Sequence, residues 1–172
     1  NETSFMYNGE IITLETDPYR RNSSDIKIFK YNPVNKTRVY LNSSNGPINR
    51  NSFSQVLFND KIIIFGGVSY NDDGSVDAYY NDIWQYDIPS QTWTELESEN
   101  GPEARSGSFA VIYNDKMIVY GGSAFIDNDD NTDFYDLWQY NIDDQTWEEL
   151  QSTDDPLQSP DLPYNDIHYF SI

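Results

Sequence analysis

Acidic and amide residues at alternate positions in two segments have the spacing of ligands for a hard cation. The segments read Asn71-x-Asp73-x-Ser75-x-Asp77 and Asp127-x-Asp129-x-Asn131-x-Asp133. Calcium takes six to eight oxygen ligands, which carboxylate and amide side chains can supply. Neither segment has the downstream bidentate glutamate of an EF-hand, because Trp138 stands at the twelfth position of the second one. The main prediction is therefore that the protein binds neither a metal nor another cofactor, with calcium binding kept as an alternative.

The chain has few residues that could perform catalysis. It has no cysteine, which excludes disulfides, thiolate nucleophiles and Cys-ligated zinc, and its one histidine is His168. Gly-Gly pairs occur at two places, but each ends an apolar strand without a following helix, so neither predicts a phosphate-binding loop. We expect that this protein is not an enzyme.

An internal repeat organises the middle of the sequence. The segment from Leu41 to Arg50 matches the segment from Leu96 to Arg105 at an offset of 55 residues. The same offset relates Asn59-Asp-Lys-Ile-Ile-Ile-Phe-Gly-Gly to Asn114-Asp-Lys-Met-Ile-Val-Tyr-Gly-Gly. An offset of 54 then relates two Asp-x-Trp-Gln-Tyr segments and two Gln-Thr-Trp segments, so one residue is lost in the intervening loop.

Each repeat predicts four short strands. In the first repeat these are residues 55–58, 62–65, 83–88 and 92–96, with a tight hairpin turn at Asn59-Asp60. The unbroken apolar run 62–65 is typical of a strand that is buried on both faces. Residues 68–79 and 123–133 are expected to be polar loops. We expect the tryptophans to fill the space between adjacent sheets, with each indole N–H bonded to backbone.

These repeats resemble the kelch family. The resemblance depends on a pair of glycines and three spaced aromatic residues in each repeat. In the first repeat these are Gly66, Gly67, Trp84, Tyr86 and Trp93, and in the second they are Gly121, Gly122, Trp138, Tyr140 and Trp147. It implies an all-β fold in which each repeat is one four-stranded blade of a β-propeller. Related propellers include copper oxidases, but their site needs a Cys and several His residues, which this sequence does not supply. They also include sialidase-like enzymes, which use Arg and Tyr residues for catalysis, and that activity is a further alternative here.

The two ends of the chain match the repeat less closely. Residues 1–49 predict a degenerate blade in which Phe29 and Arg38 stand where tryptophans are expected. Residues 50–104 and 105–156 predict two full blades, and 157–172 predict part of a fourth, in which His168 takes a Trp position. Three blades and a stub do not close a ring, so we expect the rest of the propeller to lie outside this sequence.

The predicted function is a scaffold that binds a protein or peptide through the loops of one propeller face. The resemblance implies that loops between second and third strands share a face with loops joining successive blades. The candidate binding residues are the acidic residues of these loops and two recurring arginines: Asp72, Asp73, Asp77, Asp127, Asp129, Asp130, Asp133, Arg50 and Arg105. For the arginines, a structural ion pair and a partner contact are both open.

The net charge is −19, from 29 acidic and 10 basic residues. This charge favours basic partners and disfavours nucleic acid and anionic membranes. We expect a cytoplasmic protein without direct membrane contact, since no apolar run approaches the length of a membrane span. A secreted or cell-surface glycoprotein with a structural or adhesive role is the alternative, because Asn-x-Ser/Thr triplets occur in the first quarter, at Asn1, Asn22, Asn35 and Asn42.

Overall fold

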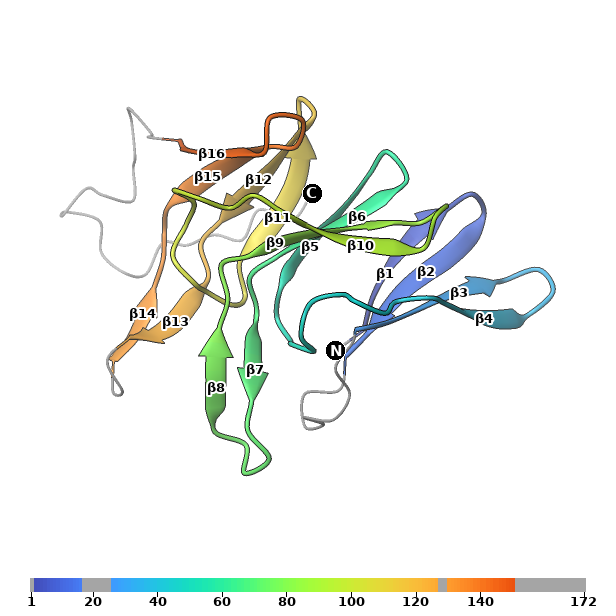
Figure 1. Ribbon diagram of the computed structural model, residues 1–172, viewed down its shortest axis with the longest axis horizontal. Helices are drawn as coiled ribbons and strands as arrows, with labels where there is room; N and C mark the ends of the chain where they lie inside the picture. Colours follow the sequence, from blue (N-terminus) through green and yellow to red (C-terminus); the bar gives the residue numbers. More distant parts are fainter. Residues whose placement is uncertain (1, 17–25, 127–129, 151–172) are drawn as a thin grey trace, which may run out of the picture.

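The computed structural model describes residues 2–16, 26–126 and 130–150 (Figure 1). The described residues contain sixteen strands and no helix. The strands form three four-stranded sheets and two two-stranded hairpins, all antiparallel. The expected all-β architecture is therefore confirmed.

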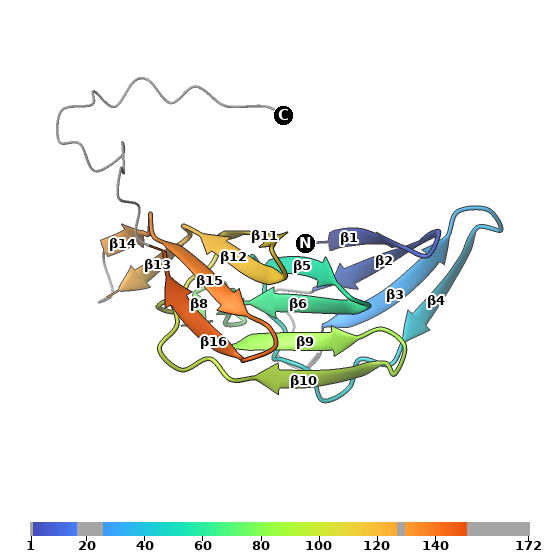
Figure 2. The same cartoon turned by 90° about the horizontal axis from the view of Figure 1, so that it is seen from above.

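Each sheet is built from one repeat unit, and we call the three sheets the first, second and third blades. The first blade contains β1 (Glu2–Tyr7), β2 (Glu10–Glu15), β3 (Lys27–Asn32) and β4 (Thr37–Leu41). The second contains β5 (Ser54–Phe58), β6 (Lys61–Phe65), β9 (Ile83–Asp87) and β10 (Thr92–Leu96). The third contains β11 (Phe109–Tyr113), β12 (Lys116–Tyr120), β15 (Leu137–Asn141) and β16 (Thr146–Glu149). Figure 2 shows that β1, β5 and β11 lie along one side, whereas β4, β10 and β16 lie along the other.

The turns follow the residue types that the sequence places there. Asn59 and Asp60 both have positive φ, 45° and 61°, as the two-residue turn between β5 and β6 requires. Asn114 and Asp115 repeat this turn between β11 and β12 with φ of 47° and 59°. The predicted hairpin turn is confirmed, and it fixes the register of the β5–β6 and β11–β12 pairs.

Two apolar cores lie between successive blades. Within β6, Ile62 and Ile64 pack against the first blade, whereas Ile63 and Phe65 pack against the third. All four side chains are buried. This alternation explains the unbroken apolar run, because a central blade must present an apolar surface on both faces.

Trp93 and Trp147 fill these two interfaces as expected, one in each core. Each indole lies against a glycine of the linker that leaves the preceding blade, Gly46 for Trp93 and Gly101 for Trp147. Their Nε1 atoms are buried with no hydrogen-bond partner among the described residues. The expected bond from each indole N–H to backbone is therefore wrong, because the glycine backbone provides a flat surface for the ring rather than an acceptor.

The two segments expected to be loops are partly strands. The first forms a hairpin of β7 (Val68–Tyr70) and β8 (Val76–Tyr79), and the second a hairpin of β13 (Ser123–Ile126) and β14 (Asp130–Asp133). Pairing satisfies backbone groups that a loop would leave to solvent. The predicted fourth-blade strand, with His168, lies outside the described residues.

Candidate protein-interaction face

Both hairpins project from the same end of the sheets (Figure 1). The linker that joins the second blade to the third reaches this end, where the N–H of Arg105 donates to the carbonyl of Tyr80 at 3.0 Å. The N–H of Gly67 donates to the carbonyl of Arg105 at 2.8 Å. We call the two hairpins and the linker 97–106 the hairpin face. The expectation that these segments share one face is confirmed, whereas the loop 151–160, which was expected on the same face, lies outside the described residues.

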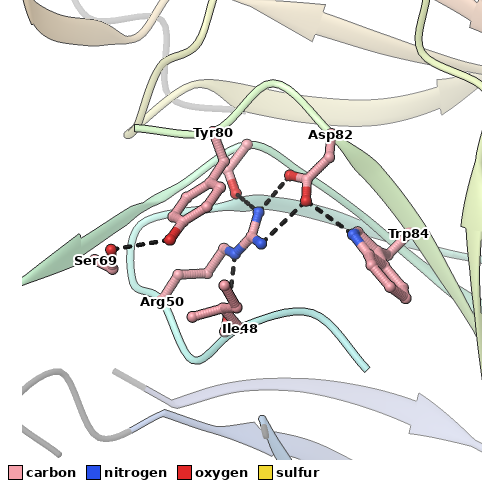
Figure 3. Close-up of polar contacts among 7 residues, drawn as sticks. Ile48, Arg50, Ser69, Tyr80, Asp82 and Trp84 are labelled. Carbon is pink, nitrogen blue, oxygen red and sulfur yellow. Dashed lines mark hydrogen bonds and ion pairs between the residues drawn. The ribbon is translucent and has the colours of Figure 1, made fainter. Parts of the chain in front are cut away.

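Arg50 is buried at the base of the first hairpin, with a side-chain exposure of 2% (Figure 3). Its guanidinium forms a bidentate ion pair with Asp82, in which Nη2 lies 3.0 Å from Oδ2. Nε donates to the carbonyl of Ile48 at 3.0 Å, and Cζ lies 3.6 Å from the ring centre of Tyr80. Asp82 also accepts a hydrogen bond from Nε1 of Trp84 at 2.9 Å.

Arg105 repeats this arrangement in the third blade. Its side chain is 1% exposed and forms a bidentate ion pair with Asp136, with Nη2 2.9 Å from Oδ2. Its Cζ lies 3.9 Å from the ring centre of Phe134, and Trp138 Nε1 donates to Asp136 at 2.8 Å. Of the two alternatives for these arginines, the structure shows the ion pair.

The electrostatic environment of Asp136 reflects two opposing effects. Burial raises the pKa of its carboxyl, but hydrogen bonds from Arg105 and Trp138 and the charge of Arg105 outweigh burial and hold the pKa below its ordinary value. Asp136 is therefore ionised at neutral pH and available to pair with the buried guanidinium. Sequence reasoning did not select Asp82 or Asp136, although each recurs two residues before a repeated tryptophan, which is the signal that could have found them.

The acidic residues of the first hairpin are exposed at its tip and along β8. Asp73 Oδ1 accepts hydrogen bonds from the N–H and hydroxyl of Ser75, at 2.9 and 2.6 Å, so it holds the turn. Asp77 accepts from the hydroxyl of Ser69 at 3.2 Å. Asp72, Asp73 and Asp77 are all exposed to solvent, so the structure brings them together on the hairpin face.

The second hairpin is described less completely. Asp133 is exposed at the end of β14, and Asp130 begins that strand. Asp127 and Asp129 lie outside the described residues. Among the described residues, no group of three or more His, Cys, Asp or Glu side chains is placed to hold a metal ion. In the first candidate calcium segment, the side-chain amide of Asn71 donates a hydrogen bond to the Ser75 hydroxyl, and the carboxylate of Asp73 accepts one from the Ser75 N–H.

Charge is distributed unevenly between the two ends of the blades. On the linker 97–106, Glu97, Glu99 and Glu103 are exposed, and within the described part of the hairpin face Arg105 is the one basic residue, which is buried. At the opposite ends of these strands the β5–β6 and β11–β12 turns each place a lysine after an exposed aspartate, Lys61 after Asp60 and Lys116 after Asp115, so partly exposed basic residues lie there, whereas none is exposed on the described part of the hairpin face.

Exposed aromatic side chains lie among these carboxylates. Phe125 is 55% exposed and Tyr135 is 67% exposed. Tyr79 of β8 is half-buried at the base of the first hairpin. Burial raises the pKa of Tyr79, so its hydroxyl is neutral at physiological pH. The hairpin face is therefore acidic, partly aromatic and fixed to the blades beneath it.

In the described ranges, no helix has the length and apolar character needed to cross a membrane.

Comparison with known proteins places the chain among repeat proteins. Residues 13–162 match the family model described as the KLHDC2/KLHL20/DRC7 Kelch-repeats domain. The mouse (Mus musculus) protein named leucine-zipper-like transcriptional regulator 1 is 29% identical over 120 residues, and Kelch domain-containing protein 3 from Mus musculus is 28% identical over 106 residues. These alignments cover 65% and 59% of this chain, and 13% and 27% of those proteins.

The fold comparison agrees with the sequence comparison. A solved structure described as "Structure of YjhT" superposes with a TM-score of 0.66 and 17% sequence identity, covering 86% of this chain and 50% of that chain. At this identity the similarity concerns the fold alone. The match over residues 13–162 and the three repeated blades together show that the chain belongs to the kelch-repeat family and forms part of a β-propeller.

Proposed function

We propose that this chain is a protein-interaction module, rather than an enzyme, and that its hairpin face binds a basic peptide segment of a partner protein. The observation that carries the proposal is the combination of exposed carboxylates with exposed Phe125 and Tyr135 on one rigid end of the blades. Carboxylates pair with Lys and Arg side chains, and aromatic rings accept the same cations over their faces. Similarity to kelch-repeat proteins supports an interaction role in general.

The rigidity of the face supports the same proposal. Arg50 and Arg105 anchor the base of each hairpin to its own blade through their ion pairs with Asp82 and Asp136. A surface that is ordered before binding loses less conformational entropy when a partner docks. The acidic rim attracts a basic partner over a Debye length of about 10 Å at 0.1 M salt.

The test uses two fluorescein-labelled peptides of equal length, one rich in Lys and Arg and one with those residues replaced by Glu. Fluorescence anisotropy should show binding of the basic peptide alone, with an affinity that falls about tenfold or more between 50 and 300 mM salt. A variant in which Asp72, Asp133, Glu99 and Glu103 are replaced by their amides should bind the basic peptide at least tenfold more weakly.

The matched control removes the same charge from elsewhere on the surface. Amide replacement of Asp60, Asp115, Asp143 and Asp144, which are exposed and lie in the turns at the opposite ends of the strands, should leave the affinity nearly unchanged. Equal losses in both variants would show that net charge alone attracts the peptide. Equal binding of the basic and acidic peptides would refute the proposed chemistry.

A cytoplasmic location belongs to the same proposal. Asn35 and Asn42, two of the glycosylation triplets, are exposed on the first blade. Asn42 nevertheless makes a contact with the next blade, since its N–H donates to Gln91 Oε1 at 2.8 Å. Protein isolated from its native source should show no mass change on glycosidase treatment, and a shift would instead support the secreted alternative.

A further inference from the structure

Asparagine is followed by glycine at three places in the chain: Asn8-Gly9, Asn45-Gly46 and Asn100-Gly101. In this dipeptide the amide nitrogen of the glycine can attack the side-chain carbonyl carbon of the asparagine, because glycine has no Cβ to obstruct the approach. All three asparagines are exposed, and their φ angles are 49°, 61° and 57°. The asparagines are therefore alike, and the surroundings of each glycine distinguish the three sites.

The reaction is a deamidation that needs only water as co-reactant. The glycine nitrogen loses its proton and bonds to Cγ of the asparagine, the bond from Cγ to Nδ2 breaks, and the leaving amide takes up a proton and departs as ammonia. Water then adds to one of the two carbonyl carbons of the resulting succinimide ring and opens it. Opening at one carbonyl gives aspartate, whereas opening at the other gives isoaspartate, whose main chain is longer by one methylene. No group is oxidised or reduced.

The two linker sites are held by the tryptophans of the blade interfaces. A Cβ added at Gly46 would lie 2.5 Å from Cδ1 of Trp93, and one added at Gly101 would lie 2.4 Å from Cδ1 of Trp147. A buried proline also follows each glycine and restricts its backbone. Ring closure requires the peptide between asparagine and glycine to turn until its nitrogen reaches Cγ. In both linkers that rotation would move a glycine packed on a buried indole, which a close-packed interface resists.

The remaining dipeptide lies in open surroundings. Asn8 and Gly9 form the turn between β1 and β2, where Tyr7 pairs with Glu10. Both turn residues are exposed, and a Cβ added at Gly9 would meet no described atom within 4 Å. An exposed turn at the end of a hairpin opens at a lower cost in free energy than a packed interface does. The peptide between Asn8 and Gly9 can therefore turn without displacing a packed side chain.

The same turn in the other two blades lacks the glycine. Asn59-Asp60 and Asn114-Asp115 are exposed turns between first and second strands, with φ angles of 45° and 61° and of 47° and 59°. The turn Asn8-Gly9 has the similar angles 49° and 78°. In the two Asn-Asp turns, however, an aspartate Cβ stands beside the attacking nitrogen, and the carboxylate disfavours loss of its proton. Of these five dipeptides, Asn8-Gly9 alone combines an open turn with a following glycine.

We propose that Asn8 is a site of spontaneous modification in the folded protein, converted through a succinimide to aspartate and isoaspartate, whereas the two linker asparagines are protected by packing. The isoaspartate product changes the first blade. Its longer main chain no longer fits the two-residue turn that pairs Tyr7 with Glu10, because loop length fixes the register of a hairpin. Tyr7 packs against the core between the first and second blades, so this product loosens the β1–β2 hairpin at that core.

Incubation of the natural chain at about pH 8.5, followed by peptide mapping with mass spectrometry, measures all three sites in one sample. In the folded protein, loss of the asparagine should be at least tenfold faster at position 8 than at positions 45 and 100. In concentrated urea the three rates should agree within about threefold, because no site is then held by packing. Equal rates in the folded protein would refute the proposal. A tenfold difference that persists in urea would also overturn it, since local sequence rather than structure would then set the rates.

Two matched substitutions separate the effect of the turn from that of the glycine. Gly9→Asp gives the first blade the Asn-Asp turn of the other blades, so it should keep the hairpin and slow the loss of Asn8 at least tenfold. Asp60→Gly makes the reverse change in the second blade and should bring the rate at Asn59 within about threefold of the rate at Asn8. Undiminished loss of Asn8 in Gly9→Asp, or no gain at Asn59 in Asp60→Gly, would refute the proposal where the melting temperature shows that the variant is folded.

The variant Asn8→Asp tests the consequence for the first blade, because it supplies the aspartate product with a normal main chain. Anion exchange separates the modified protein from the natural chain, since each product carries one more negative charge. The modified protein, which contains isoaspartate, should melt at a lower temperature than Asn8→Asp, and the amides of β1 and β2 should exchange at least tenfold faster. Equal melting temperatures and equal exchange would contradict the assigned effect of isoaspartate on the hairpin.

Discussion

Nη2 of Arg105 lies 2.9 Å from Oδ2 of Asp136, and this ion pair joins two segments of the chain at the base of the third blade's hairpin. Arg105 belongs to the linker before β11, whereas Asp136 immediately precedes β15. The ion pair therefore connects the segment that enters the blade to the segment that returns from the hairpin. Arg50 and Asp82 make the same connection in the second blade, at 3.0 Å.

Arg105→Ala should destabilise the protein by about 3 kcal/mol, because it leaves the partly buried carboxylate of Asp136 without its cation. The change also removes hydrogen bonds to the carbonyls of Glu103 and Gly121. Urea unfolding followed by tryptophan fluorescence measures the loss. Arg38→Ala serves as the control, since the Arg38–Glu15 pair is exposed and should contribute about 1 kcal/mol or less.

The stability contributed by Asp136 should depend on pH in a defined direction. Its pKa in the folded protein lies below the ordinary value of 3.8, so the unfolded chain binds the proton more tightly. The contribution is therefore present above about pH 4 and is lost as the pH falls through the lowered pKa. The difference in free energy of unfolding between the natural protein and Asp136→Asn should shrink between pH 7 and pH 3. A difference that is constant over this range would contradict the assigned pKa shift.

Much of the fold was predictable because the repeat carries its own physical signals. Asn59-Asp60 selects a tight turn, and the apolar run ending at Phe65 requires burial on both faces. The hairpins were missed because β7 and β8 are short, three and four residues, and their pairing has a register shift between Ser69 and Tyr70 that breaks simple alternation.

The candidate site was predictable in part. The recurrence of Arg50 and Arg105 marked both residues, but only the three-dimensional structure shows that their charges are directed inward to Asp82 and Asp136. The acidic character of the hairpin face followed from composition. Its aromatic residues did not, because the exposure of Phe125 depends on which face of β13 points to solvent.

Tyr86→Phe should weaken the contact between the first and second blades. The Tyr86 hydroxyl donates to the carbonyl of Asn42 at 2.6 Å, and its removal leaves that carbonyl without this donor, at a cost of about 1–2 kcal/mol at pH 7. Burial raises the pKa of Tyr86 to about 12. The stability from the neutral phenol is present below about pH 10 and is lost as the pH rises through the raised pKa.

This prediction is tested by measuring the free energy of unfolding at alkaline pH. The free energy of unfolding of Tyr86→Phe should approach that of the natural protein between pH 10 and the highest pH at which both remain folded. Tyr113→Phe is a suitable control, since Tyr113 is 66% exposed and its hydroxyl is open to solvent. A gap between Tyr86→Phe and the natural protein that widens with pH would contradict the assignment.

Gly101→Ala should destabilise the interface between the second and third blades through a steric clash alone. Gly101 does not have positive φ, so backbone strain does not contribute. An added methyl group would overlap the indole of Trp147, which is 9% exposed and packed on Phe65. Overpacking of this kind costs about 2 kcal/mol, because a close-packed interface cannot move the ring without disturbing its neighbours.

A double-mutant cycle separates this clash from a general effect of alanine in the linker. Trp147→Ala alone should cost about 3 kcal/mol or more through lost burial, but it removes the ring that the added methyl group of Gly101→Ala would meet. The double variant should therefore be more stable than the sum of the single losses predicts, by about 1 kcal/mol. Gly46→Ala with Trp93→Ala should repeat the result at the first interface, where the added Cβ would lie 2.5 Å from Cδ1 of Trp93. Additive losses at both interfaces would show that the glycines are not required by the rings packed against them.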